Sequence, residues 1–70
     1  MIRAVIVDDE VDGRDLLENL LLDFCDDVQV EAKAASALEG IKVIQQCKPD
    51  VVFLDINMPN GSGFDLLEAF

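Results

Sequence analysis

Residues 51–63, VVFLDINMPNGSG, decide the fold of this chain. Four apolar residues lead directly into Asp55, and the loop that follows contains Pro59, Gly61 and Gly63. A short apolar run that ends at turn residues is typical of a buried β-strand. The carboxylate at its end is either a turn or helix-capping residue, or a group held out for chemistry. The rest of the chain decides between these two interpretations.

The composition indicates a folded, strongly acidic domain. The 70 residues are 51% hydrophobic, and fifteen acidic residues against five basic ones give a formal net charge of −10. This charge argues against binding of nucleic acid or of an anionic membrane through this segment, and favours cations or a basic protein partner. No apolar run approaches a membrane span and no signal peptide is recognisable, so we expect a cytoplasmic protein. Cys25 and Cys47 are expected to be reduced, small apolar residues.

Three strands are predicted, at residues 2–7, 28–34 and 51–54, with a helix between consecutive strands. This order favours the α/β class, in which helices cover both faces of a parallel sheet in three layers. The second strand alternates between apolar and polar residues, so we place it at an edge, whereas the other two are apolar on both faces and belong inside. The strand order 2-1-3 satisfies these conditions. It brings the C-terminal ends of the first and third strands together at a topological switch point.

The helices are predicted from their apolar spacing and their caps. The first is expected to run from Asp12, as its N-cap, to about residue 24. The second is expected to begin with the S-x-x-E capping box of Ser36 and Glu39 and to end near residue 48. Its inward-facing residues are predicted to be Leu38, Ile41, Ile44 and Cys47.

The third strand raises a question about its far edge. A strand that is apolar on both faces needs a neighbour on each side, and an open apolar edge is a template for pairing with another chain. We therefore expect either that the 70 residues are part of a longer domain, or that a second copy covers this edge in a homodimer. A last helix, which begins near residue 63, is expected to continue beyond residue 70.

Carboxylates follow the two strands that are expected to be neighbours. Asp8 and Asp9 come directly after the first strand, and Asp55 comes directly after the third. Neighbouring strands lie ~4.8 Å apart, so we expect the three acids to share one shallow pocket. Carboxylates this close repel one another unless one is protonated or a cation lies among them, and all-oxygen ligands suit Mg²⁺ or Mn²⁺. The backbone carbonyl of Asn57 is a further candidate ligand.

This arrangement of acids suits phosphoryl transfer. With a divalent cation bound, a carboxylate oxygen can attack an incoming phosphoryl group and form an aspartyl phosphate. Asp55 is the preferred nucleophile because it directly follows a buried strand and the loop at residues 59–63 leaves room for a phosphate. Asp9 is then the preferred metal ligand, with Asp8 assisting directly or through water. Each acid alone is more often a turn residue or a helix cap, so the hypothesis depends on the three together.

Two motifs, IVDDE at residues 6–10 and PDVVFLDINMPNGSGFDLL at residues 49–67, resemble the receiver domain of two-component response regulators. The resemblance covers essentially the whole chain. It implies a flavodoxin-like fold with strand order 2-1-3-4-5 and Mg²⁺-dependent phosphorylation by a sensor histidine kinase, without turnover of a substrate. It also implies the roles of six residues: Asp55 as phospho-acceptor, Asp8 and Asp9 as the acidic pair, Asn57 as a metal ligand through its carbonyl, and Pro59 and Gly63 as loop-shaping residues.

Receivers also use a Ser or Thr after the fourth strand and a Lys after the fifth. Both positions fall beyond residue 70, and none of the lysines of this chain matches the family's lysine. We therefore expect residues 1–70 to be the N-terminal part of one receiver domain, with three strands, two helices and the start of a third.

Three alternatives compete with the receiver. A phosphatase of the haloacid-dehalogenase type needs an Asp two residues after the nucleophile as general acid, and Asn57 cannot donate that proton. A calcium loop that starts at Asp8 would place Asn19 where a bidentate Glu is required. A receiver-like module that serves only in dimerisation, without phosphorylation, stays open for these 70 residues.

Overall fold

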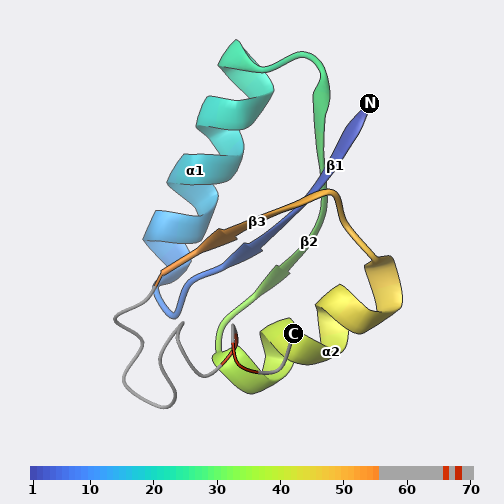
Figure 1. Ribbon diagram of the computed structural model, residues 1–70. Helices are drawn as coiled ribbons and strands as arrows, with labels where there is room; N and C mark the ends of the chain where they lie inside the picture. The colour runs from blue at the N-terminus through green and yellow to red at the C-terminus, as the bar shows by residue number, and fades with distance from the viewer. Residues whose placement is uncertain (56–65, 67, 69–70) are drawn as a thin grey trace.

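A computed structural model of the chain describes residues 1–55, 66 and 68. Figure 1 shows a three-layer arrangement, with one helix on each face of a small sheet. Leu66 and Glu68 are helical, whereas the predicted start of the last helix lies outside the described residues. The elements in chain order are β1 (Ile2–Val7), α1 (Val11–Phe24), β2 (Val28–Ala34), α2 (Ala37–Cys47) and β3 (Val51–Leu54).

The sheet confirms the predicted strands and their order. β1 pairs in parallel with β2 on one side and with β3 on the other, giving the order β2-β1-β3. The second half of β1, from Ala4 to Val7, is at most 1% exposed, because a helix covers each of its faces and a strand lies along each edge. β2 alternates as predicted, with Gln29, Glu31 and Lys33 exposed. The sequence therefore correctly identifies β1 as the central strand and β2 as an edge strand, whereas the predicted inside position of β3 is not seen among the described strands, where β3 pairs only with β1.

The start of α1 differs from the prediction. Glu10, and not Asp12, occupies the N-cap, and its side chain makes no capping hydrogen bond. The Asp8 carboxylate accepts a hydrogen bond of 2.9 Å from the Glu10 backbone N–H, so the chain already turns before the helix begins. Arg14 N–H donates to the Glu10 carbonyl at 3.0 Å and closes the first turn. Asp12 instead lies within that turn, where its charge is favourable to the helix dipole.

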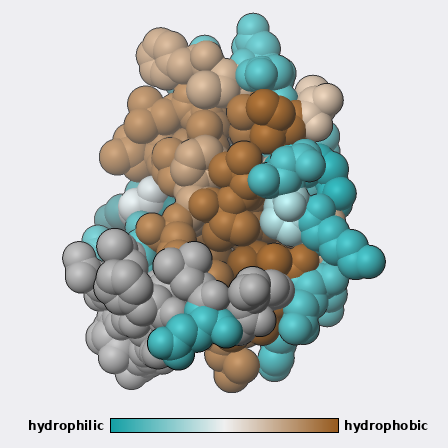
Figure 2. All heavy atoms as spheres, viewed as in Figure 1, coloured by the Kyte–Doolittle hydropathy of each residue, from teal (hydrophilic) through white to brown (hydrophobic). Residues whose placement is uncertain are grey.

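The apolar residues of α1 only partly contact the sheet. Leu21 is buried and Leu17 is half-buried, whereas Leu16, Leu20 and Phe24 are exposed. Figure 2 shows hydrophobic side chains gathered on the face formed by α1 and β3. β3 pairs only with β1 among the strands that the structure describes, so its other edge has no strand beside it within those residues. Within the same residues, no helix is both long and apolar enough to cross a bilayer.

The predicted cap of α2 is present. Ser36 is the N-cap, and its hydroxyl accepts a hydrogen bond of 3.1 Å from the Glu39 backbone N–H. The inward placement of Ile41, Ile44 and Cys47 is confirmed, since they pack against the core.

The inward placement of Leu38 is wrong. Its side chain is 65% exposed, and Ala37 and Gly40 are buried instead. The reason is the close approach of α2 to the sheet. A Cβ on Gly40 would lie 3.0 Å from a Val7 methyl and 2.8 Å from a Leu66 methyl. Only the smallest residues of α2 fit at this contact.

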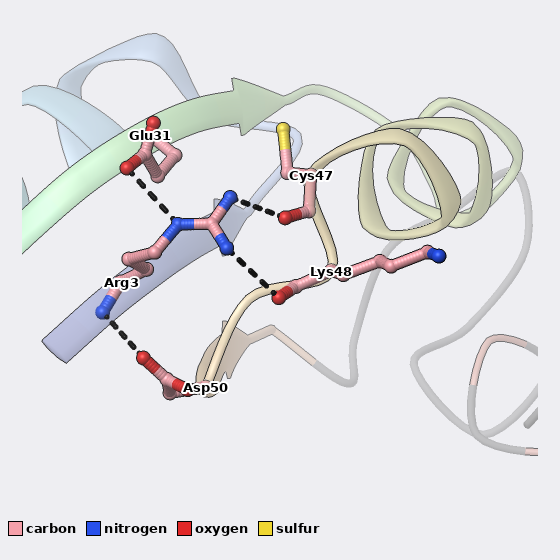
Figure 3. Close-up of polar contacts among 5 residues, drawn as sticks. All are labelled: Arg3, Glu31, Cys47, Lys48 and Asp50. Carbon is pink, nitrogen blue, oxygen red and sulfur yellow. Dashed lines mark hydrogen bonds and ion pairs between the residues drawn. The ribbon is translucent and has the colours of Figure 1, made fainter.

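Arg3 ties the start of β1 to the end of α2 (Figure 3). Its guanidinium donates hydrogen bonds to the carbonyls of Cys47 and Lys48 and forms an ion pair of 3.2 Å with Glu31. Its backbone N–H donates to the Asp50 carboxylate at 2.9 Å, and the Asp50 N–H returns a bond of 2.8 Å to the Arg3 carbonyl. α2 has no basic residue in its last turn, so Arg3 supplies the cation that the C-terminal end of a helix favours.

Candidate metal site

The hydrogen bonds of the sheet position Asp8 and Asp55. The backbone N–H of Asp8 donates to the carbonyl of Ala34 at 3.0 Å, and that of Asp55 donates to the carbonyl of Val7 at 2.9 Å. The ladder of hydrogen bonds therefore extends one residue beyond the ends of β1 and β3. Because both strands run in the same direction, both acids lie at the same rim of the sheet.

The structure brings the three acids predicted from the sequence together. Asp8, Asp9 and Asp55 each offer a carboxylate oxygen, and these three oxygens lie within 4.8 Å of one another. Asp8 and Asp55 are half-buried. Forty-six residues separate Asp9 from Asp55 in the sequence, and the parallel pairing of β1 with β3 removes that separation in space.

The donor set fits a small divalent cation. All three ligand groups are carboxylates, and oxygen-only sites that leave positions for water are typical of Mg²⁺ and Mn²⁺. Three negative charges within this distance repel one another, and a cation among them relieves the repulsion. No other group of three or more His, Cys, Asp or Glu residues with converging ligand atoms is found in residues 1–55, 66 and 68.

The conformation of Asp8 is fixed from several directions. The Asp8 carboxylate accepts a hydrogen bond from the Glu10 backbone N–H, and the Asp8 backbone carbonyl accepts one of 2.7 Å from the Arg14 guanidinium. Gly13 packs closely against it, since a Cβ there would lie 2.7 Å from a carboxylate oxygen of Asp8. The first turn of α1 and the residue before it therefore hold Asp8 in place.

Arg14 is the residue of this region that the sequence analysis missed. Its position, one turn into a helix that follows an acid pair, is the signal that would have indicated it. It is a half-buried cation, and its donated bond goes to the backbone carbonyl of Asp8. Arg14 therefore orients Asp8 through its backbone carbonyl.

A hollow of about 270 Å³ lies below the acids, between α1 and β3. The two acids Asp8 and Asp55 form its polar end, and apolar side chains form the rest. Carboxylates beside an apolar wall interact more strongly with a cation than carboxylates in open water do. The apolar lining consists of Ile6, Val7, Leu17, Phe53 and Leu54.

Three of the residues singled out from the sequence lie outside the described residues. They are Asn57, the candidate carbonyl ligand, and Pro59 and Gly63, the loop-shaping residues. Their roles stay predictions.

Residues 4–70 match the family model of the response regulator receiver domain. The chain belongs to this family, as its two motifs indicated, and its fold is the flavodoxin-like fold of receivers. It is 48% identical over 67 residues to an uncharacterized response regulatory protein of Vibrio cholerae, and 39% identical over 67 residues to the transcriptional regulatory protein BtsR of Escherichia coli. These matches cover 96% of this chain and 28% of each relative, so the chain spans about a quarter of their length.

Solved receiver structures are similar over nearly the whole chain. The response regulator domain of Thermotoga maritima CheB superposes with a TM-score of 0.89 at 34% identity, covering 97% of this chain and 50% of that one. CheY in the CheX–CheY–BeF₃–Mg complex of Borrelia burgdorferi gives a TM-score of 0.85 at 26% identity, covering 94% and 49%. The chain therefore spans about half of the receiver chains that it matches.

Proposed function

We propose that the chain is the phospho-acceptor part of a response regulator receiver, with Asp55 taking a phosphoryl group from a sensor histidine kinase. Asp8, Asp9, Asp55 and the backbone carbonyl of Asn57 would hold Mg²⁺ or Mn²⁺ for this step. The observation that supports the proposal is the convergence of three carboxylate oxygens within 4.8 Å at the end of two neighbouring strands. The cytoplasmic location and the absence of nucleic-acid binding through this acidic segment belong to the same proposal.

The bound cation would supply charge neutralisation, so that an anionic phosphoryl group can approach an anionic carboxylate. The chain's own residues supply the geometry. The backbone of Asp55 is fastened to β1 through its bond to the Val7 carbonyl, which holds the nucleophile still relative to the acid pair. An oxygen of Asp55 forms the new bond to phosphorus while the bond from phosphorus to the kinase histidine breaks, and the electron pair of that bond stays on the imidazole nitrogen.

The product is an acyl phosphate on Asp55, and the chain is the acceptor in this step instead of a turnover enzyme. Phosphorylation would add negative charge at the rim of the sheet, beside the cation. Such a local change of charge is the kind of event that biases a two-state element in signalling proteins.

The test is phosphorylation by acetyl phosphate in the presence of Mg²⁺, followed by intact mass. We expect the wild-type chain to gain the mass of one phosphoryl group and Asp55→Asn to gain none. Asp23→Asn, which changes an exposed acid of α1, is the matched control and should be modified like the wild type. An adduct that survives in Asp55→Asn would contradict the assignment of the acceptor. No adduct even on a complete receiver domain that contains this chain would favour the non-phosphorylated interaction module.

We also propose that a second copy of the chain covers the face formed by α1 and β3. Two features support this: the edge of β3 has no partner among the described strands, and the neighbouring leucines of α1 are exposed. Strand edges of this kind pair with other strands, and apolar faces of this kind mark association sites. Light scattering over a range of concentrations should show a dimer that Leu20→Glu dissociates, with Leu38→Glu as the control. A monomer at every concentration would contradict this proposal.

A further inference from the structure

A second hollow, of about 440 Å³, lies between the second half of α1 and the start of β2. We call it the α1–β2 groove, and the lining residues that matter are Met1, Glu18, Leu22, Asp26, Val28 and Val30. Val28 and Val30 are paired with Ile2 and Ala4, at the amino end of the strands. The acid site follows Val7, at the carboxyl end. The groove and the acid site therefore lie at opposite ends of the sheet.

Leu22, Val28 and Val30 form the apolar part of the groove lining, which we call its apolar centre. Leu22 is 61% exposed, whereas the two valines of β2 are half-buried. Leu22 comes six residues after Leu16, roughly 240° further around the helix, so it is not part of the apolar face formed by α1 and β3. An exposed leucine beside a hollow with apolar walls is a feature of surfaces that receive an apolar side chain.

The rim of the groove is acidic. Glu18 and Asp26 line it, and the exposed acids Asp23 and Asp27 directly follow the lining residues Leu22 and Asp26 in the sequence. No basic side chain lines the groove in the part of the chain that the structure describes. Lys33 is close, but its ammonium group already binds Asp15 and Glu18, at 3.3 and 2.9 Å.

We propose that the α1–β2 groove binds a basic amphipathic segment of a partner protein. An apolar side chain of that segment would enter beside Leu22, and a flanking Lys or Arg side chain would meet Asp26, because Glu18 already pairs with Lys33. The apolar centre would supply affinity, and the acidic rim would select a basic partner. A partner in this position leaves the acid site uncovered, so it could remain bound while Asp55 reacts. The proposal rests on the surface alone and stands whether or not Asp55 is phosphorylated.

The test is fluorescence anisotropy with two labelled amphipathic peptides, one of Leu and Lys and one of Leu and Glu. We expect the Leu/Lys peptide to bind and the Leu/Glu peptide not to bind. Leu22→Lys should weaken binding by about tenfold, because it places a charge in the apolar centre. Leu38→Lys is the matched control, since it introduces the same charge at an exposed leucine of α2, and it should weaken binding by about twofold at most.

Binding should also depend on the acids of the rim more than on the total charge. Asp26→Asn should weaken binding of the Leu/Lys peptide more than Asp12→Asn does, although each substitution removes one exposed acid. Amide chemical shifts should change around Leu22 and Val30. Far-ultraviolet circular dichroism of each variant would confirm that it is folded.

Four results would overturn the proposal. The first is that the Leu/Lys peptide does not bind, and the second is that the Leu/Glu peptide binds as tightly. The third is that Leu22→Lys and Leu38→Lys weaken binding equally, which would make net charge the cause. The fourth is that the chemical-shift changes centre on Leu20 and Phe53, on the face formed by α1 and β3. Each of these removes the groove as the binding site.

Discussion

Replacing Arg3 with Met should destabilise the fold measurably, because one guanidinium joins three elements. It donates to the carbonyls of Cys47 and Lys48 at the end of α2 and pairs with Glu31 on β2, while its own backbone belongs to β1 (Figure 3). Met keeps the apolar stem of the side chain and removes only the charged head. The substitution therefore isolates the polar contacts.

The magnitude follows from these contacts. A typical hydrogen bond contributes about 0.5–1.5 kcal/mol net, and a cation at a helix C-terminus contributes about 0.3–1 kcal/mol. The side chain of Arg3 is 43% exposed, so solvent screens these contributions and the ion pair with Glu31 adds little. We expect a loss of about 1–2 kcal/mol in the free energy of unfolding, measured by urea titration with circular dichroism.

Two further variants make the result specific. Arg3→Lys keeps the charge but lacks the planar fork that reaches two carbonyls at once, so its stability should lie between those of the wild type and Arg3→Met. Lys42→Met removes the same charge from an exposed position on α2 and should change stability by less than about 0.5 kcal/mol. If Arg3→Met is as stable as Lys42→Met, the reasoning from these contacts is refuted.

Three other predictions concern packing, pH and metal affinity. Gly40→Ala should lower the free energy of unfolding by about 1 kcal/mol in a urea titration, because the close contact of the new methyl group with Val7 outweighs the gain in helix propensity. A stabilised variant would show that the sheet moves aside at little cost. Hydrogen bonds from Lys33 to Glu18 and Asp15 raise the pKa of Lys33 above its ordinary value of 10.5. The ion pairs of Lys33 therefore contribute fully to stability below pH 10.5, and this contribution is lost as the pH rises through the raised pKa. In that pH range the wild type should lose more stability than Lys33→Met. Parallel plots of stability against pH for the two proteins would refute this. Arg14→Gln should lower Mn²⁺ affinity by about tenfold in calorimetry, because Asp8 loses its support, whereas tighter binding would show that repulsion by the cation dominates.

Much of the fold follows from local patterns in the sequence. The bounds of the three strands and their order were predicted, because an alternating strand and two strands apolar on both faces can be arranged in few ways. That order was also sufficient to bring Asp55 to the acid pair. The adjacency of these acids is a consequence of parallel pairing, which places the ends of neighbouring strands at one rim.

The wrong predictions concern positions whose structure is determined by contacts between distant parts of the chain. Leu38 was expected to face inward because it is apolar, but the approach of α2 to Val7 requires small residues, and Ala37 and Gly40 take that face. Asp12 was expected to cap α1, but the Asp8 side chain turns the chain earlier. Neither contact has a signature in the local sequence.

The support around the site was likewise invisible in the sequence. The bond from Arg14 to the Asp8 carbonyl depends on the angle at which α1 leaves the rim, and the role of Arg3 depends on where α2 ends beside β1. Both arginines act on backbone carbonyls, which every residue possesses, so no residue pattern marks the partner.

The most direct test of the central claim, that acids from two strands share one cation, is titration of ¹⁵N-labelled protein with substoichiometric Mn²⁺. Paramagnetic broadening should remove the amide signals of Asp8, Asp9 and Asp55 first and together, and Asp9→Asn should abolish this selectivity. The exposed acid pair Asp26 and Asp27 provides an internal control at the other end of the sheet. Broadening that begins at this pair, or that reaches Asp9 without Asp55, would contradict the shared site.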